Sequence, residues 1–319
     1  FDSMNGQLEH IYAAGSPDAG IYVGECYPCN TVLDDVTSEH NGLGYSGTNS
    51  GGNLLIVNSI FRFNRAGVVP NSGSYELCYP ERETTIIGNL VYSNNQADTP
   101  AIDVAILAMG NGILTAGGVR NLIQRNLVYD HDKSGIGLVP FLEEDPNDSM
   151  PTREQWDETC EQSKQRTPVD PGAPLLWDSA ESRVLDNVMS DNRVADLLVA
   201  SAGTDVSSLG HCFGGNTFTT SLPKALEIAA DLVRTALAYP HVTAVEADGT
   251  TWHAGGATEA QEATRDYKLV RAKNEDGSVM VSVIGGKLTT YRVLAEEVMD
   301  LLADVLVHQI GRASCRERV

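Results

Sequence analysis

The sequence predicts an all-β protein, a right-handed parallel β-helix (solenoid) over residues 1–225, followed by a small C-terminal α/β segment. Two observations predict this fold class. Short apolar stretches recur along the first two thirds of the chain, and a polar residue, most often Asn, recurs with them at a base period of about 23 to 25 residues. Near residue 222 this repeat ends, and helical spacing and one long strand replace it. We therefore expect stacked coils followed by a different unit.

The marked polar positions of the repeat are 25, 23, 31, 37, 61 and 29 residues apart, and five of the seven are Asn: His10, Asp35, Asn58, Asn89, Asn126, Asn187 and Asn216. A second polar residue often follows six positions later, as at Asn41, Asn64, Asn95 and Asp132, and a Gly then precedes the next apolar stretch. A coil can cover its apolar side chains only by stacking on its neighbours. A buried Asn amide both donates and accepts, so the same amide one coil away can satisfy it. We therefore expect asparagine ladders at the bends.

The repeat segments also carry a resemblance, seen at residues 19–30, 75–82 and 126–133. Residues 1–225 resemble secreted right-handed parallel β-helix repeat proteins of the pectate-lyase-like superfamily. This superfamily includes polysaccharide lyases, glycosidases, epimerases and plain binding modules. The resemblance implies a secreted or cell-surface protein. We expect a monomer whose partner is a polysaccharide or a cell-surface glycan. Whether the chain is an enzyme stays open.

Composition limits the partners further. Of 319 residues, 22 are Lys or Arg and 43 are Asp or Glu, which gives a formal charge of −21. A field of this sign repels a phosphate backbone, so no nucleic-acid partner is expected, whereas Ca²⁺ or a neutral sugar is compatible. No run approaches the roughly 18 apolar residues of a membrane span, so none is expected. The chain opens without an initiator Met or an apolar leader, and we expect that any targeting segment is missing from it.

Three stretches interrupt the period, at about 70–84, 96–118 and 140–180. Loops on a stacked scaffold usually carry function, so we expect the contact surface there. The prolines of the third stretch favour a defined irregular loop over a helix. Five aromatic residues could stack on sugar rings or pack within these loops: Tyr75, Tyr79, Tyr129, Trp156 and Trp177.

Candidate catalytic and metal-binding residues precede and open the third stretch. Asp130, His131, Asp132 and Lys133 bring carboxylates, an imidazole and an ammonium together, and Glu143, Glu144 and Asp145 are candidate Ca²⁺ ligands. A uronate lyase would use Ca²⁺ to neutralise the substrate acid and a Lys as base, whereas a glycosidase would use two facing carboxylates. The alternative is a polar bend that follows the ladder. The pair Asp34-Asp35 lacks the partners expected of a polygalacturonase.

The cysteines indicate structural disulfides. Cys26 and Cys29 form a lone CxxC, which lacks the second pair that zinc would need and fits a local disulfide of a secreted protein. Cys78, Cys160 and Cys212 could pair across coils, which leaves one of them unpaired. The string Gly42–Gly47 matches GxGxxG, but no strand precedes it and no helix follows, so we interpret it as a glycine-rich bend.

The C-terminal part follows a different pattern. Residues 222–237 have helical spacing, and a linker extends to 264. Residues 279–284 form a predicted strand, followed by Gly-Gly and a second amphipathic helix at 294–305. Residues 265–309 resemble FAD-dependent glycerol-3-phosphate dehydrogenases, which implies that Gly285, Gly286, Lys287, Leu288 and Thr289 would face the flavin. Because the rest of that family's flavin domain is absent, we expect an inactive fragment without FAD.

The last ten residues, 310–319, resemble a translated sequencing adapter. With the two resemblances above, this suggests the hypothesis that a piece of a β-helix protein was joined to a piece of an oxidoreductase. Calcium is then the one cofactor that the sequence supports, and only for the lyase alternative.

Overall fold

The computed structural model describes residues 2–201 and 206–223 with their side chains, and the backbone of four further strands between residues 244 and 285. The chain divides into two compact units, and the second comprises Asp231–Arg312. Within the described part of the chain, no helix is long and apolar enough to cross a membrane.

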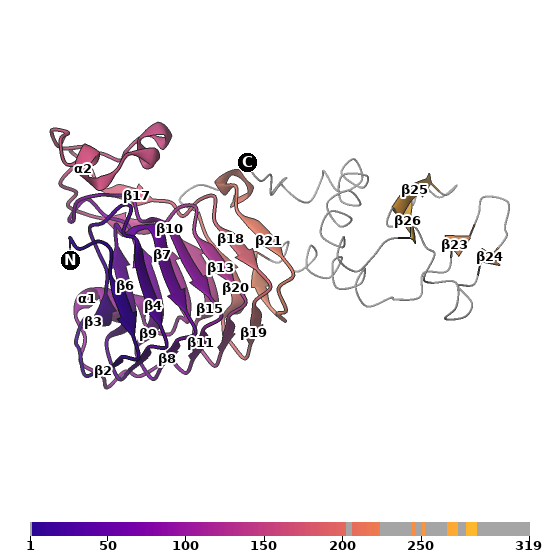
Figure 1. Cartoon of the computed structure of the whole chain (residues 1–319), viewed down its shortest axis with the longest axis horizontal. Coiled ribbons are helices and arrows are strands. Elements are labelled where there is room, and N and C mark those ends of the chain that lie inside the picture. The colour runs from indigo at the N-terminus through magenta and orange to yellow at the C-terminus, as the bar shows by residue number, and fades with distance from the viewer. Residues whose placement is uncertain are drawn as a thin grey trace. The chain divides into compact units, whose positions relative to one another are not determined.

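The first unit is a solenoid of three parallel sheets (Figure 1). Sheet A contains β1 (Gln7–Glu9), β4 (Thr31–Asp34), β7 (Gly51–Val57), β10 (Arg82–Ile87), β13 (Leu122–Gln124), β18 (Arg183–Leu185) and β21 (Cys212–Gly214). Sheet B contains β2 (Tyr12–Ala14), β5 (Thr37–Glu39), β8 (Ile60–Arg62), β11 (Leu90–Tyr92), β14 (Leu127–Tyr129) and β19 (Val188–Ser190). Sheet C contains β3 (Ala19–Tyr22), β6 (Leu43–Thr48), β9 (Ala66–Asn71), β12 (Ile113–Ala116), β15 (Ser134–Val139), β20 (Ala195–Val199) and β22 (Ser221–Leu222).

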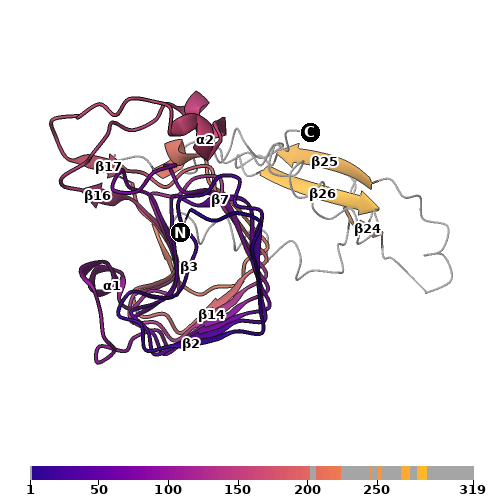
Figure 2. The ribbon, with the colours of Figure 1, turned by 60° about the vertical axis from the view of Figure 1, so that its left-hand side comes forward.

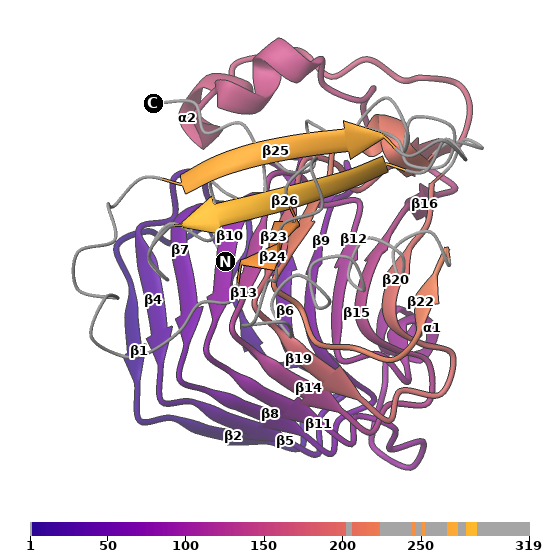
Figure 3. The same ribbon diagram turned by 90° about the vertical axis from the view of Figure 1, so that its right-hand side faces the viewer.

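Each coil adds one strand to sheets A, B and C in turn, so the sheets enclose a single core (Figure 3). Connections between parallel neighbours are right-handed, as parallel crossovers generally are. The right-handed parallel β-helix predicted from the repeat is therefore confirmed. Equivalent side chains stack in register inside it. Sheet A supplies Leu33, Ile56, Ile86, Ile123 and Val184, all fully buried.

The first asparagine ladder lies at the bend between sheets A and B. Each backbone N–H here donates to the side chain of the equivalent residue one coil on, along Ser59, Asn89, Asn126, Asn187 and Asn216. The three N-terminal marks of the predicted ladder were wrong by one residue. His10, Asp35 and Asn58 occupy the preceding position, where every residue has positive φ.

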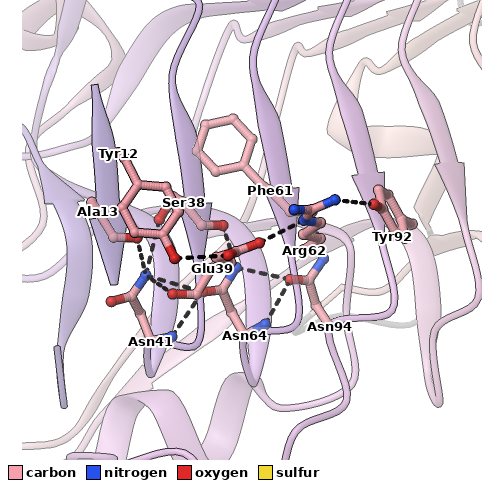
Figure 4. Close-up of polar contacts among 10 residues, drawn as sticks. All are labelled: Tyr12, Ala13, Ser38, Glu39, Asn41, Phe61, Arg62, Asn64, Tyr92 and Asn94. Carbon is pink, nitrogen blue, oxygen red and sulfur yellow. Dashed lines mark hydrogen bonds and ion pairs between the residues drawn. The ribbon is translucent and has the colours of Figure 1, made fainter. Parts of the chain in front are cut away.

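The second ladder lies between sheets B and C and consists of Asn41, Asn64, Asn94, His131 and Asn192. Figure 4 shows its first three amides in line. The predicted members Asn95 and Asp132 are wrong by one residue in the other direction, because the register of the strands places the preceding residues, Asn94 and His131, in the ladder. His131 is thus a rung of the ladder.

The first two inserts between strands are shorter than predicted, and the third is slightly longer. The first covers 72–81, between β9 and β10. The second covers 93–112 and contains α1 (Asp103–Ala108), because Ile113–Ala116 forms β12 instead of loop. The third covers 140–182. It is irregular as expected, with a small hairpin of β16 (Phe141–Glu143) and β17 (Leu175–Trp177), a 3₁₀ turn (Arg153–Asp157) and α2 (Cys160–Ser163). A second 3₁₀ turn, Val206–Leu209, precedes β21.

The cysteine predictions hold in part. Cys26 and Cys29 form the expected local disulfide, and Cys78 pairs with Cys160 across an insert. No cysteine in the described residues is free, and Cys212 also has a partner, so the expected unpaired cysteine is not found. The string Gly42–Gly47 is not a bend, because Leu43–Thr48 forms β6.

The second unit contains two antiparallel strand pairs in its described residues. β23 (Ala244–Val245) pairs with β24 (Thr251–Trp252), and β25 (Tyr267–Lys273) pairs with β26 (Val279–Gly285), which confirms the strand predicted at 279–284. Leu222, predicted to open a helix, ends β22 instead. The predicted helices, residues 286–289 of the flavin-like motif and the adapter-like tail lie outside the described residues.

Candidate functional site

The three inserts all border sheet C. The first and third leave from the ends of its strands β9 and β15, and the second leads into its strand β12. Figure 2 shows α1 and the β16–β17 hairpin standing out from the side of the solenoid on which β3 lies. The outer face of sheet C is therefore flanked by inserted chain on both edges, whereas sheets A and B carry no insert on their outer faces in the described coils.

The second insert is held by apolar contacts. Ala105 and Ala108 of α1 pack on the outer face of sheet C, against the buried residues Leu43, Ala66, Val69 and Leu114. Small residues on this side of α1 allow the helix to approach the sheet closely. α1 thus forms one fixed wall beside the sheet.

The opposite wall is held by a buried carboxylate. Glu143, at the end of β16, is 5% exposed and accepts hydrogen bonds from the Ser74 backbone N–H at 3.0 Å, the Ser74 hydroxyl at 2.8 Å and Trp177 Nε1 at 2.8 Å. These bonds join the first insert to the third. The Tyr75 ring also lies edge-on to Phe141, with ring centroids 6.1 Å apart.

Polar and aromatic side chains gather on sheet C beside this wall. We call Tyr22, Thr48, Asn71, Tyr75 and Glu76 the sheet C cluster. Asn71 Oδ1 accepts from Thr48 Oγ1 at 3.0 Å and from Tyr75 Oη at 2.7 Å, and Tyr22 Oη donates to the Glu76 carboxylate. Tyr75 is 43% exposed, so its ring is available to a ligand.

The carboxyl groups near the cluster are partly desolvated. Burial raises the pKa of Glu76, and its neighbours Glu25 and Asp18 raise that pKa further, while the hydrogen bond from Tyr22 opposes the shift. Burial also raises the pKa of Asp18, just before β3. The aromatic rings of Tyr22 and Tyr75 and a protonatable carboxyl thus share one surface, and the buried Asn71 and Thr48 bond to one another beneath it. Such a set can stack on a ring and exchange several hydrogen bonds with a polyhydroxylated ligand.

The predicted catalytic residues are split by the fold. His131 is 2% exposed, and its ring nitrogens contact Asn94 Nδ2 at 3.2 Å and Asn192 Oδ1 at 2.8 Å. Burial lowers the pKa of His131 to about 4, so the imidazole is neutral at physiological pH. This placement fits a structural role.

The other three members of that group, Asp130, Asp132 and Lys133, are exposed at the same corner. Asp130 accepts from Ser93 Oγ at 2.5 Å, and Lys133 Nζ donates to the Leu107 carbonyl at 3.2 Å. The corner therefore presents two carboxylates and one ammonium to solvent beside α1.

The predicted calcium ligands are also divided. Glu143 points inward to Ser74 and Trp177, as described above. Glu144 and Asp145 are exposed and line a shallow pocket with Asp170. Within the described residues, no group of three or more His, Cys, Asp or Glu side chains is arranged to hold a metal ion. A calcium site at these positions stays a prediction.

The predicted sugar-stacking residues lie in different environments. Tyr79 and Trp177 are buried and pack against one another at 5.8 Å, and Trp156 lies under Arg120. Tyr75 joins the sheet C cluster. Tyr129 lies on sheet B and stacks on Tyr92.

Sequence reasoning missed Tyr22, Thr48, Asn71 and Glu76. The signal for them was indirect. Tyr22, Thr48 and Asn71 each end a strand of sheet C, Glu76 lies in the first insert after β9, and only the register of the coils brings them together.

No family model matches the chain, and no curated protein matches it. Among solved structures, the periplasmic alginate epimerase AlgG is similar, with 15% sequence identity and a TM-score of 0.42. The similarity covers 66% of this chain and 39% of that structure, so the chain spans about two fifths of the length of that protein.

Proposed function

We propose that this chain is an extracytoplasmic β-helix protein that binds carbohydrate on the outer face of sheet C. One observation carries the proposal: the sheet C cluster lies on a rigid parallel sheet whose two edges are walled by inserts. The exposed Tyr75 ring supplies an apolar surface and Glu76 supplies a directed polar group, while the buried Asn71 holds the Tyr75 hydroxyl in place. This is the combination that orients a sugar in a shallow site.

The cysteines support the extracytoplasmic part of the proposal. Structural disulfides persist in oxidising compartments and are rare in the cytosol. The Cys78–Cys160 bond joins the first insert to the third, close to the proposed site.

A glycan array probed with the full chain tests the proposal. We expect binding by the wild-type protein, and at least tenfold weaker binding by Tyr75→Ala and by Glu76→Gln, because each change removes one of the two ligand-facing functions. Tyr12→Ala is the matched control, since Tyr12 is an exposed tyrosine (63%) on sheet B. Unchanged binding by both sheet C variants would contradict the proposed site.

A Ca²⁺-assisted polysaccharide lyase is the second candidate, because Asp130, Asp132 and Lys133 are exposed together at one corner. It would use Lys133 as the base and the carboxylates to hold Ca²⁺. A uronide cleavage assay, following the unsaturated product with and without Ca²⁺, separates the lyase from a binding module. If the lyase operates, Lys133→Ala abolishes product formation and His131→Asn does not.

An FAD-dependent dehydrogenase is the third alternative, which rests on the C-terminal resemblance. We expect no bound flavin in the absorbance spectrum of the purified protein. A flavin band in that spectrum would support the dehydrogenase alternative.

A further inference from the structure

A row of side chains crosses the outer face of sheet B, on the side of the solenoid without inserts. Tyr12 Oη donates to Glu39 at 2.7 Å, Glu39 pairs with Arg62 at 2.6 Å, and Arg62 Nη1 donates to Tyr92 Oη at 2.8 Å (Figure 4). These residues occupy nearly equivalent positions on successive coils. Each side chain is therefore held by its neighbours, and the row is rigid.

The row continues as an aromatic stack. Tyr92 and Tyr129 are register partners on β11 and β14, and their rings are parallel, with an interplanar angle of 4° and centroids 5.1 Å apart. Because the two rings lie one coil apart along the solenoid, their faces look along its axis. Tyr92 covers one face of the Tyr129 ring.

The other face of the Tyr129 ring looks toward the next coil. The register partner of Tyr129 there is Ser190, whose side chain is too short to cover a ring. The Tyr129 hydroxyl also makes no hydrogen bond within the described residues. Tyr129 thus ends the stack with an open aromatic face and a phenol that is available to a ligand.

Polar and apolar groups surround this open face. Ser190 offers a hydroxyl, Asp191 beside it is exposed, and Leu127 and Val188 are 42% and 45% exposed on the same sheet. Adjacent coils are about 4.8 Å apart, close to the separation at which a flat ring stacks on an aromatic face. A pyranose ring is about as thick as one such layer.

From this geometry we infer a second sugar-binding site, in which a pyranose ring stacks on the open face of Tyr129 over Ser190. The ring takes the position that a tyrosine would fill if the stack extended by one coil. Ser190 and Asp191 bond its hydroxyls, and the fixed row from Tyr12 to Tyr92 keeps the platform rigid, which lowers the entropic cost of binding. The inference rests on the proposed function only for the class of ligand, because its residues are separate from the sheet C cluster.

Calorimetric titration of the full chain tests the inference, with β-1,4-linked hexasaccharides of glucose, mannose and N-acetylglucosamine as probes. We expect Tyr129→Ala to weaken binding at this site by about five- to tenfold, and Tyr129→Phe to retain most of it because the ring persists. Ser190→Leu is the decisive variant. It leaves Tyr129 in place but covers its open face with an aliphatic side chain, which offers no aromatic face of its own, so it also loses binding while the fold is kept.

The outcomes distinguish the two sites. Binding lost in Tyr129→Ala and Ser190→Leu but largely kept in Tyr129→Phe supports the inference, whatever Tyr75→Ala does. Binding lost only in Tyr75→Ala and Glu76→Gln overturns the inference and leaves the proposed function standing. Wild-type affinity in both sheet B variants, or no binding of any probe by the wild type, also overturns it.

Discussion

A column of glycines lies beside the second asparagine ladder. At each, an added Cβ atom would lie 3.0 Å or less from the ladder side chain of the next coil, which is closer than almost all real contacts. The column comprises Gly20, Gly44, Gly67, Gly112 and Gly135. It ends at Asp196, whose carboxylate accepts from Asn192 Nδ2 at 2.8 Å. The lack of room for a Cβ atom at these positions therefore explains why a polar residue in this repeat is followed by a glycine.

Gly112→Ala tests this steric requirement. An alanine Cβ would lie 2.6 Å from the Gly135 carbonyl and 2.8 Å from His131 Cε1, and neither a packed strand nor a bonded ring can yield without cost. We expect the free energy of unfolding to fall by about 1–3 kcal/mol, measured by denaturant titration.

Gly214→Ala is the matched control. At Gly214 the nearest atom would be a flexible Leu185 methyl at 3.4 Å, an ordinary contact, so we expect little change. Equal effects of the two substitutions would show that general strand propensity explains the loss better than the ladder does.

The repeat was predicted correctly, but the predicted ladder positions were displaced by one residue in some coils. Asn tolerates positive φ better than most residues, so it also occupies the bend position, as at Asn58. In later coils Gly88, Arg125 and Asp186 fill that position. Because Asn occurs both at the bend position and at the ladder position beside it, the sequence alone does not tell which Asn belongs to the ladder. Only the strand register separates the two positions.

At the element scale, His131 shows how the ladder tolerates a different side chain. A neutral imidazole can donate from Nδ1 to Asn192 Oδ1 and accept at Nε2 from Asn94 Nδ2, as an amide would. Protonation would place a second donor against the Asn94 amide and a charge in the core. The ladder therefore requires the neutral form.

This requirement predicts acid sensitivity. The pKa of His131 is about 4 in the fold against 6.5 for an exposed His, so between these values the unfolded chain binds more protons. The stabilisation is complete above pH 6.5 and is lost as pH falls toward 4, by up to about 3 kcal/mol.

His131→Asn should remove this part of the pH dependence, because Asn fills the other four rungs. We expect the difference in unfolding free energy between variant and wild type to favour the variant increasingly from pH 7 to pH 4. His211, whose pKa burial also lowers to about 4, is unchanged in both proteins and cancels in the comparison. A difference that is constant with pH would contradict the neutral-rung interpretation.

The candidate site was predictable only in part at this scale. Interruptions of the period located the inserts, and composition singled out Tyr75. The alternation of side chains, however, turned His131 into the core and left Asp130 and Asp132 outside, which no local pattern revealed. Glu76 and Asn71 carry no motif, and they meet Tyr22 only because coils 1 to 3 stack in register.

At the scale of the whole molecule, the third insert is tied to the solenoid by contacts far apart in sequence. The buried Arg82 guanidinium donates to the carbonyls of Cys78 at 2.8 Å, Pro80 at 2.6 Å and Glu158 at 2.8 Å, and it lies 3.6 Å from the centre of the Tyr27 ring. The Cys160 backbone N–H donates to the Tyr27 carbonyl at 2.8 Å. The disulfide from Cys78 to Cys160 lies within this junction.

The two described disulfides close loops of different length, and this predicts unequal contributions to stability. Cys78 and Cys160 are 82 residues apart, whereas Cys26 and Cys29 are three apart. If loop entropy dominates, replacing the first pair with Ala lowers the free energy of unfolding by about 4 kcal/mol and replacing the second by about 1–2 kcal/mol. Denaturant titration of the two double variants measures both values.

The same comparison links stability to the proposed site. Loss of the long-range bond frees the wall that holds Tyr75, so the Cys78→Ala, Cys160→Ala variant should also bind glycan more weakly at a temperature where it is fully folded, whereas the Cys26→Ala, Cys29→Ala variant should not. If the first variant is less stable but binds as tightly as wild type, then Arg82 and Glu143 alone position the insert, and the disulfide serves the fold without serving the site.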